Sequence, residues 1–370
     1  MKELNIGANL IKNRRRRGIT QEALAEYMGV SKASVSKWET GATYPDITLL
    51  PRLATFFNIS IDELIGYEPQ MAKEDIRSLY RQICRDFSEK PFETVMGQCR
   101  EITRKYFACA PLLFQIGALY VNHCMLADTP EKTSAVLEEA AELFVRVREE
   151  SREVALQTLA VNMQALCMLQ LGRNDEVLAL LSSQASITMP PEPLLASAFQ
   201  RKGNLPEARR TLQAGIYQNV VALANLLLPY MELCGDDEAS FDESRKRIFA
   251  IAETFRLKDL HPSILVTAYL CIAQEFAKKE KPTQALAALE DYTNLVLSDI
   301  YPLRLHGDSF FNLLDEWIEE NLALGSDSPR NEAIIKKSML SAVADNPVFA
   351  PLAGYAEFQH IIHRLKKCVS

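Results

Sequence analysis

The chain has 370 residues, of which 48% are hydrophobic and 24% are charged, with only 14 glycines and 17 prolines. This length exceeds what one hydrophobic core usually serves, so at least two packing units are expected, and the low glycine content favours helices. A formal net charge of −7 excludes a protein that coats nucleic acid or anionic membrane with its whole surface.

The charge is distributed unevenly along the chain. Residues 1–45 contain eight Lys and Arg side chains and four Glu side chains, a balance of +4, which leaves −11 for the other residues given the total of −7. A basic N-terminal segment on an acidic body is the asymmetry expected when one end of a protein meets a polyanion.

The eight cysteines are scattered singly, without any C-x-x-C pair, and mostly lie inside apolar helical patterns. Buried, reduced thiols are therefore expected, because free cysteine packs as a small hydrophobe. The N-terminus lacks the apolar core of a secretory signal, and the most apolar stretch, "VVALANLLLPYMEL", is short and interrupted by Asn225 and Pro229. We expect a protein of the reducing cytoplasm that makes no membrane contact.

Two short helices are predicted at the start of the chain. The first, in "LNIGANLIKNRRRRG", places Leu4, Ala8 and Ile11 on one apolar stripe and ends at Gly18. Thr20 is then in the position of an N-cap for the second helix, "QEALAEYM". The turn "GVS" that follows begins with a glycine, which adopts the positive φ of a tight turn without strain.

A third helix is predicted from about Lys32 to Thr40, with Ser31 as its N-cap. Two helices joined by a three-residue turn that begins with glycine are the parts of a helix-turn-helix. Val35 and Trp38 lie three residues apart and are expected to face inward. The outward positions carry short or cationic side chains and no carboxylate: Lys32, Ala33, Ser36 and Lys37.

Two more helices complete a compact five-helix unit. The fourth lies in "DITLLPRLATFFN" and ends at Asn58, a residue that tolerates the left-handed conformation. The fifth lies in "SIDELIG", where Ser60 and Glu63 have the spacing of a capping box.

Many positions in residues 6–66 agree in one register with a known pattern. They are Thr20-Gln21-Glu22-x-Leu24-Ala25, Gly29-Val30-Ser31, Val35-Ser36-x-Trp38-Glu39-x-Gly41, Pro45 and Leu53-Ala54. This segment resembles the Cro/phage-repressor type of helix-turn-helix, often called the XRE family. The resemblance implies a domain that places its third helix in the major groove of double-stranded DNA.

The resemblance also implies roles for individual side chains. Gln21 corresponds to a glutamine that contacts phosphate. Lys32, Ala33 and Lys37 correspond to base-edge readers, and Ser31, Ser34 and Ser36 supply further hydrogen bonds to phosphate or bases. This chemistry is reasonable, because Lys donates to guanine O6 and N7 and an alanine methyl rests on a thymine methyl.

The four arginines Arg14–Arg17 have two interpretations. In the first, they form a solvated helix end whose cations offset the negative end of the helix dipole. In the second, one or two of them, Arg16 and Arg17, touch phosphate and strengthen binding to any DNA sequence in a salt-dependent way.

Residues 69–75, inside "GYEPQMAKED", break the helical pattern. We interpret them as a linker between a DNA-binding domain of residues 1–68 and a helical domain of residues 76–370. Beyond the linker, long amphipathic helices are predicted near 74–87, 91–106, 110–126 and 131–150, and again near 216–234 and 240–256.

Three segments of this second domain repeat one spacing: "ALCMLQLGRNDEVLALL", "ASAFQRKGNLPEARRTL" and "AQEFAKKEKPTQALAAL". The matching positions are Ala165, Met168, Val177 and Leu181; Ala196, Phe199, Ala208 and Leu212; and Ala273, Phe276, Ala285 and Leu289. Small residues let two antiparallel helices approach closely. The spacing resembles the tetratricopeptide repeat, although the usual opening Trp and closing Pro are missing. We expect a right-handed solenoid of about five to seven helix pairs with a concave, peptide-receiving groove.

Motifs that suggest chemistry have simpler explanations. In "HGDSFF", Asp308 or Ser309 is placed to cap a following helix, and no strand precedes the motif as a hydrolase would require. His360, His363 and Cys368 lack a fourth metal ligand. We therefore expect no enzyme activity, no catalytic residue, no cofactor and no metal.

Asparagines on helix faces are candidates for peptide binding, because an asparagine side chain bonds a peptide N–H and C=O together. The candidates are Asn122, Asn162 and Asn225, with Asn294 as a further position, and each has an alternative role as an ordinary exposed residue.

The order of the two domains resembles the RRNPP group of transcription regulators, which sense short signalling peptides in the solenoid and dimerise through it. The resemblance implies a homodimeric regulator on a palindromic operator, controlled by a short peptide. Two alternatives remain open: the solenoid binds a protein partner, or it serves only for dimerisation.

Overall fold

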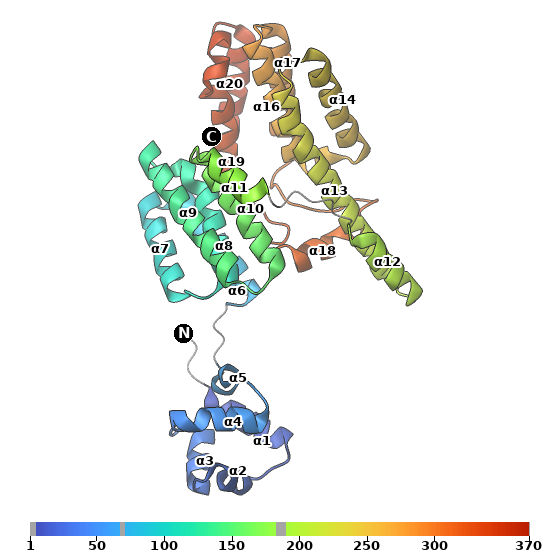
Figure 1. Ribbon diagram of the computed structural model, residues 1–370. Coiled ribbons are helices and arrows are strands. Elements are labelled where there is room, and N and C mark those ends of the chain that lie inside the picture. Colours follow the sequence, from blue (N-terminus) through green and yellow to red (C-terminus); the bar gives the residue numbers. More distant parts are fainter. Residues whose placement is uncertain (1–4, 67–70, 183–189, 370) are drawn as a thin grey trace.

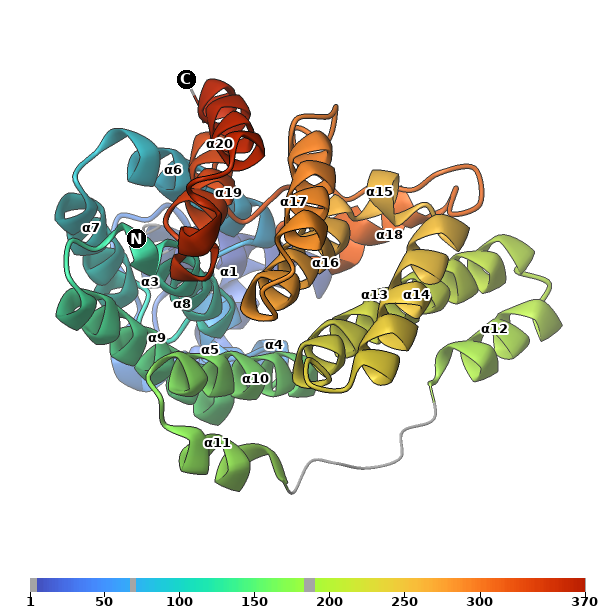
Figure 2. The same cartoon turned by 90° about the horizontal axis from the view of Figure 1, so that it is seen from above.

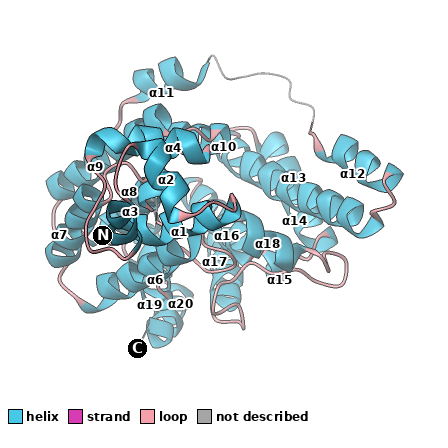
Figure 3. Cartoon of the chain, turned by 90° about the horizontal axis from the view of Figure 1, so that it is seen from below, coloured by secondary structure: helices cyan, strands magenta, loops and turns pink. Residues whose placement is uncertain are grey.

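The computed structural model describes residues 5–66, 71–182 and 190–369, and Figure 1 shows that this part of the chain is built from helices. The described residues contain no strand, and their one extended pairing is an isolated antiparallel bridge between Arg304 and Asp327 (Figure 3). The predicted all-α class is confirmed. A small N-terminal group of helices, called the head below, precedes a larger helical body (Figure 1).

The head consists of residues 5–66. Its elements are α1 (Ile6–Arg16), α2 (Gln21–Met28), α3 (Lys32–Glu39), the 3₁₀ helix η1 (Ile47–Leu49), α4 (Leu50–Phe57) and α5 (Ile61–Ile65). Their apolar side chains form one core, which includes Leu10, Leu24, Val35 and Leu53 and takes no described residue from beyond position 66. The five predicted helices are therefore present around a core of their own.

The predicted apolar stripe of α1 is wrong. Ala8 is exposed and Ile11 is half-buried, Leu4 lies outside the described residues, and the buried positions are instead Ile6 and Leu10. The cause is Gly7, where an added Cβ would lie 2.8 Å from the backbone oxygens of Trp38 and Glu39. The helix turns this glycine toward α3, and the buried stripe rotates with it.

The first part of the body contains six helices. They are α6 (Lys73–Glu89), α7 (Phe92–Lys105), α8 (Ala110–His123), α9 (Pro130–Glu150), α10 (Val154–Gln170) and α11 (Asn174–Leu181), with a 3₁₀ helix, η2 (Cys124–Leu126), after α8. Antiparallel neighbours α8, α9 and α10 pack closely, and α6 to α10 share one large core. Residues 67–70, which include the start of the predicted linker at residue 69, lie outside the described residues. Helix α6 begins at Lys73, inside the segment interpreted as linker.

The second part of the body begins after residues 183–189, which lie outside the described residues. Its helices are α12 (Glu192–Arg201), α13 (Leu205–Leu233), α14 (Glu238–Thr254), α15 (Leu257–Leu260), α16 (Pro262–Lys278) and α17 (Pro282–Val296). The three segments with the repeated spacing form the helix pairs α10/α11, α12/α13 and α16/α17, and each pair is in contact.

The helix pairs do not form one continuous stack. Figure 2 shows α11 and α12 well separated, so the described parts of α10/α11 and α12/α13 do not lie face to face as consecutive repeats would. In addition, α13 is a single helix of 29 residues where two were expected. Gly215 lies buried inside α13, where its missing Cβ makes room for the side chain of Glu192.

The C-terminal segment joins the two parts of the body. It contains α18 (Leu314–Asn321), α19 (Glu332–Ala344), the 3₁₀ helix η4 (Pro347–Leu352) and α20 (Ala356–Val369). Residues 298–331, called the strap below, run along α6 and α13, and Arg77 of α6 donates hydrogen bonds to three strap carbonyls. In α19, Ile334 belongs to the core of the first part and Val343 to the core of the second.

Candidate nucleic-acid interface

Local signals in the sequence fix the angle between α2 and α3. The Thr20 hydroxyl accepts a hydrogen bond from the Ala23 amide, and the Ser31 hydroxyl accepts one from the Ser34 amide, as predicted for two N-caps. Between them, Gly29 has a φ of 71°, a conformation that other residues adopt only with strain. The helix-turn-helix geometry therefore follows from short-range preferences.

The inner face of α3 is locked in the head core. Val35 is 0% exposed and Trp38 is 6% exposed, so both predicted inward positions are confirmed. Pro45, which follows the helix, is also buried. A helix held on one side in this way presents the opposite side in one fixed orientation.

A charged network behind α3 ties the three first helices together. The Arg14 guanidinium donates to both carboxylate oxygens of Glu39, at 2.5 and 3.0 Å, and Gln21 Nε2 donates to the same carboxylate at 2.8 Å. Burial alone would raise the pKa of Glu39, but the hydrogen bonds from Arg14 and Gln21 outweigh it and hold the pKa below its usual range. Glu39 therefore stays ionised and bound at neutral pH.

Gln21, predicted to contact phosphate, uses only part of its hydrogen-bonding capacity in this network. Its amide nitrogen carries two hydrogens, and the bond to Glu39 occupies one of them. The contact fixes the direction of the amide at the first residue of α2, where the helix dipole already favours an anion. One N–H and the helix end remain available for a phosphate oxygen.

The outward side of α3 carries the predicted DNA-contacting residues. Lys32, Ala33 and Lys37 are exposed, whereas Ser34 and Ser36 are half-buried beside them. Ser31 is exposed, and its oxygen lies 2.9 Å from that of Ser34 while it caps α3. The structure thus brings these six side chains to one end and one face of a short helix.

A carboxylate lies beside this face, which the sequence pattern of α3 alone did not indicate. Glu22 of α2 places Oε2 3.5 Å from Lys32 Nζ, and both side chains are largely exposed. An exposed pair at this distance is weak. Because Glu22 comes from the neighbouring helix, only the three-dimensional packing of α2 on α3 reveals it.

The four arginines at the C-terminal end of α1 have different roles. Arg14 belongs to the buried network, and Arg17 lies with its guanidinium 5.2 Å from the centre of the Phe56 ring. Arg15 and Arg16 are exposed at the helix end. Arg16 is therefore free to reach a phosphate, while Arg17 would reach one from its position over Phe56.

The predicted peptide-binding asparagines lie on different helices. Asn122 of α8 is half-buried, within hydrogen-bonding reach of the Tyr80 hydroxyl, and Asn162 of α10 and Asn225 of α13 are exposed. Asn294 of α17 accepts a hydrogen bond from Arg364 at 2.7 Å. The asparagine set stays a prediction, and no described cavity is lined by any two of them.

The "HGDSFF" motif forms a turn. The Asp308 carboxylate accepts hydrogen bonds at 2.9 Å from the amides of Phe310 and Phe311, so it caps a turn, and α18 begins only at Leu314. Among the described side chains, no three His, Cys, Asp or Glu residues are grouped as a metal site would need. Burial raises the pKa of the Cys84 and Cys99 thiols to about 12, so these thiols stay protonated.

Comparison with known proteins agrees with the geometry of the head. Residues 10–64 match the Helix-turn-helix family. The head is a helix-turn-helix domain of the XRE type. Over 69 residues, the chain is 39% identical to the HTH-type transcriptional activator BcrR of Enterococcus faecalis; the match covers 18% of this chain and 34% of BcrR, so it spans about a third of that relative. The family match covers the head alone and indicates a DNA-binding domain there.

The solved structures that resemble the whole fold include two bacterial regulators. The apo form of the competence regulator ComR from Streptococcus vestibularis aligns with 13% identity and a TM-score of 0.29, covering 80% of this chain and 92% of ComR. Bacillus thuringiensis PlcR, in complex with the peptide PapR7 and DNA, aligns with 14% identity and a TM-score of 0.18, covering 98% of both chains.

Across the described ranges, no helix combines the length and apolar character needed to span a lipid bilayer.

Proposed function

We propose that this chain is a sequence-specific transcription regulator that reads DNA with α3. The observation that carries the proposal is the exposed, carboxylate-free outer face of α3, with Lys32, Ala33 and Lys37, on a helix held by buried Val35 and Trp38. Lysines at these positions donate to guanine edges in the major groove. Gln21 at the start of α2 donates its remaining N–H to a phosphate and sets the register of the head on the duplex.

The test is a fluorescence anisotropy titration of the full chain on a duplex selected from a randomised library. The double variant Lys32→Ala/Lys37→Ala should lose about 100-fold in affinity for the selected duplex, because two base contacts are removed, and should bind random DNA as weakly as before. Lys12→Ala, an exposed lysine of α1, is the matched control. Retained selectivity in the double variant would refute the assignment of α3.

We propose further that the body dimerises. Exposed apolar side chains are concentrated on α10 to α13, where the two parts of the body are not stacked; they include Val154, Leu159, Leu178, Leu194, Leu226 and Leu233, from 51 to 85% exposed. Large exposed apolar areas usually mark an interface. The proposed occupant is a second copy of this chain, because a regulator on a palindromic operator needs two heads one helical turn apart.

Sedimentation of the full chain tests the dimer. Wild-type protein at micromolar concentration should sediment as a dimer, and Leu226→Ser/Leu233→Ser should sediment as a monomer with unchanged helicity. The control is Ile47→Ser, which alters a side chain of the head that is 77% exposed. A monomeric wild-type chain would contradict the proposal.

Finally, we propose that a short peptide bound by the body alters operator binding. What supports this proposal is the junction between the two parts of the body, where one cavity lies between α6, the strap and α19 and a second lies between α16, the strap and α19. A peptide there changes how the two parts are held together and, through α6, how the head is carried. The experiment is the same anisotropy titration with and without the low-mass fraction of the host's culture medium. An unchanged affinity would leave a regulator without a small effector.

A further inference from the structure

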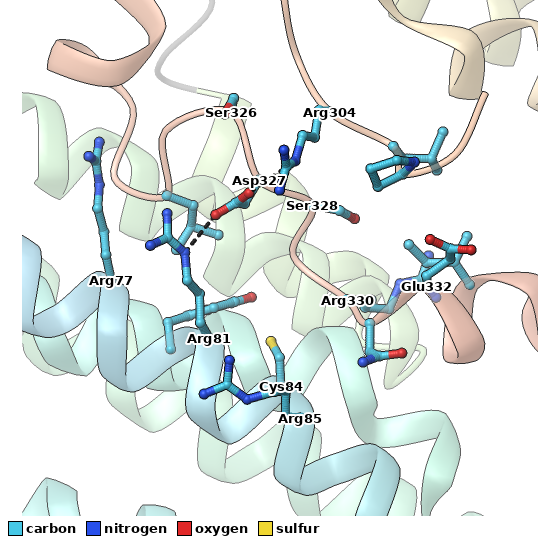
Figure 4. A pocket seen from close by; sticks show the side chains of 16 residues that line it. Arg77, Arg81, Cys84, Arg85, Arg304, Ser326, Asp327, Ser328, Arg330 and Glu332 are labelled. Atoms are coloured by element: carbon cyan, nitrogen blue, oxygen red, sulfur yellow. Dashed lines mark hydrogen bonds and ion pairs between the residues drawn. The ribbon is translucent and has the colours of Figure 1, made fainter. Parts of the chain in front are cut away.

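A cavity of about 640 Å³ lies between α6 and the strap, and Figure 4 shows that arginines surround it. Five of its lining side chains are guanidinium groups: Arg77, Arg81 and Arg85 from α6, and Arg304 and Arg330 from the two ends of the strap. We call this cavity the arginine pocket. It combines segments more than 200 residues apart in the sequence, so no local motif indicates it.

The cations in the arginine pocket exceed the anions that line it. Its two lining carboxylates are Asp327 and Glu332. Asp327 is shared, since Arg81 Nε lies 2.6 Å and Arg304 Nε 3.5 Å from its carboxylate oxygens. Glu332 pairs with Lys336 at 2.7 Å and so neutralises a different cation. The pocket therefore keeps a positive balance.

Arg77 has a structural role and is set apart from the others. Its guanidinium donates to the backbone oxygens of Glu319, Leu322 and Ala323 at 2.6 to 2.7 Å, and these bonds hold the strap on α6. Arg81 is partly committed through Asp327. The groups with capacity for a ligand are consequently Arg85, Arg304, with its one long contact, and Arg330. Of these, Arg85 lines the arginine pocket only.

Arg330 is the most unusual of these groups. It is half-buried, and among the described residues no carboxylate lies within ion-pair distance of it. Burial lowers the pKa of Arg330, although an arginine stays charged under all ordinary conditions. A half-buried cation without a counterion is unfavourable, and an anionic ligand would remove that cost.

A second cavity adjoins the arginine pocket and differs from it in character. It has a volume of about 480 Å³, and its own walls include Val266, Leu270, Tyr292 and Met339. Arg304 and Arg330 line both cavities, together with Leu303, Ile335 and residues 326–328. A ligand that bridges the two must therefore carry a negative group beside an apolar one.

We propose that the two cavities form one binding site for the C-terminal end of a short peptide. Its free carboxylate lies between Arg304 and Arg330, where the cavities meet, and its last apolar side chain fills the cavity of Val266 and Met339. Each cavity alone falls in the range that holds a drug-sized ligand, about 300–1,000 Å³. An occupant of both is elongated, as a peptide is. This inference rests on the proposed peptide-sensing function and assigns its site.

The position of the site explains how binding would reach the DNA. One wall is α6, the first described helix after the head, and the other is the strap, which also contacts α13 through Arg210 and Glu320. A carboxylate that bridges Arg304 and Arg330 ties the two ends of the strap together next to α19 and so favours one arrangement of the two parts of the body. The predicted asparagine Asn122 lies near this site, beside Tyr80 in its wall.

Affinity selection on the immobilised full chain tests the site. Two pools of random hexapeptides are used, identical except that one has free C-terminal carboxylates and the other C-terminal amides. The free-acid pool should give peptides with an apolar last residue, enriched at least about tenfold over the amide pool, because the amide cannot pair with arginine. Arg304→Gln and Arg330→Gln should each reduce this enrichment about tenfold, and Arg201→Gln, an exposed position on α12, should not.

The two arginine variants distinguish loss of the binding site from loss of folding. The Arg304 side chain is 61% exposed, so its replacement should leave the melting temperature unchanged even if Arg330→Gln lowers it. Peptides that bind wild type and both arginine variants equally would overturn this site while leaving peptide sensing in place. Equal enrichment from the amide pool would overturn the carboxylate contact. No enrichment from either pool would overturn the site and the proposed peptide-sensing function together.

Discussion

The head and the body of this protein use charged side chains in different ways. In the head, Arg14 and Glu39 form a two-bond ion pair whose side chains are 14% and 4% exposed, and this pair joins α1 to α3. In the body, Arg100 and Glu139 form an equally complete pair between α7 and α9, but their side chains are 42% and 35% exposed. The same kind of ion pair sets the geometry of the head, whereas in the body it lies on the surface of a core held together by apolar side chains.

The largest expected effect breaks the pair in the head. Arg14→Met should lower the free energy of unfolding of the head by about 3 kcal/mol, because it leaves the Glu39 carboxylate buried without its cation. Arg100→Met, the same change at the exposed pair, should cost less than about 1 kcal/mol. Both arginines donate two hydrogen bonds to one carboxylate, and Arg14 donates a third to the Ile19 carbonyl, so the comparison reports burial together with that additional bond.

Fluorescence can follow the head separately. The chain has two tryptophans, Trp38 in the head core and Trp317 in α18, so urea unfolding in a Trp317→Phe background reports the head alone. The double variant Arg14→Met/Glu39→Met should be more stable than Arg14→Met, because both charges are gone. An Arg14→Met head as stable as wild type would show that the pair does not hold α1 on α3.

Acid should weaken the Arg14–Glu39 pair and lower the free energy of unfolding of the head, by less than the Arg14→Met substitution does. The pKa of Glu39 is lower in the folded head than its usual value, so the unfolded chain binds a proton at higher pH than the folded one. The stability from this pair is present above the ordinary Glu pKa of about 4.3 and is lost as pH falls through the folded pKa. Unfolding of the Trp317→Phe chain between pH 6 and pH 3 measures it. In Arg14→Met/Glu39→Met, that part of the pH dependence should be absent.

The two regions also differ in how far the sequence predicts them. In the head, the caps at Thr20, Ser31 and Ser60 and the inward direction of Trp38 depend on residues only a few positions apart, and the structure confirms them. The rotation of α1 was not predictable in this way, because it depends on the contact between Gly7 and the distant backbone of α3.

In the body, the sequence predicts helices but not their assembly. The spacing of Ala273, Phe276, Ala285 and Leu289 identifies a helix pair correctly, since it records how two neighbouring helices touch. This spacing does not indicate which helix pair stacks on which, so the separation of α11 from α12 could not be predicted from it. The arginine pocket is still harder to predict from the sequence, because Arg81 and Arg330 line one cavity only after the strap has packed against α6.

Separating the two regions tests what the body contributes to DNA binding. Residues 1–68 alone should bind the selected duplex at least about tenfold more weakly than the full chain, because the second head then no longer acts at a high effective concentration. The head has a core of its own, and its helicity and Trp38 fluorescence serve as controls for folding. Equal affinity of the fragment and the full chain would mean that the body does not hold two heads together.

The smallest expected effect concerns the Glu22 carboxylate, which lies beside the outward side of α3. Glu22→Gln should raise affinity for DNA by about twofold to threefold, because Lys32 loses an exposed partner and the duplex no longer meets a negative charge at the start of α2. Glu26→Gln, an exposed change one turn further along α2, is the control for net charge. If both variants raise affinity equally, the effect belongs to the overall field and Glu22 does not face the DNA. A gain confined to Glu22→Gln, and larger at low salt, would place the start of α2 against the phosphate backbone.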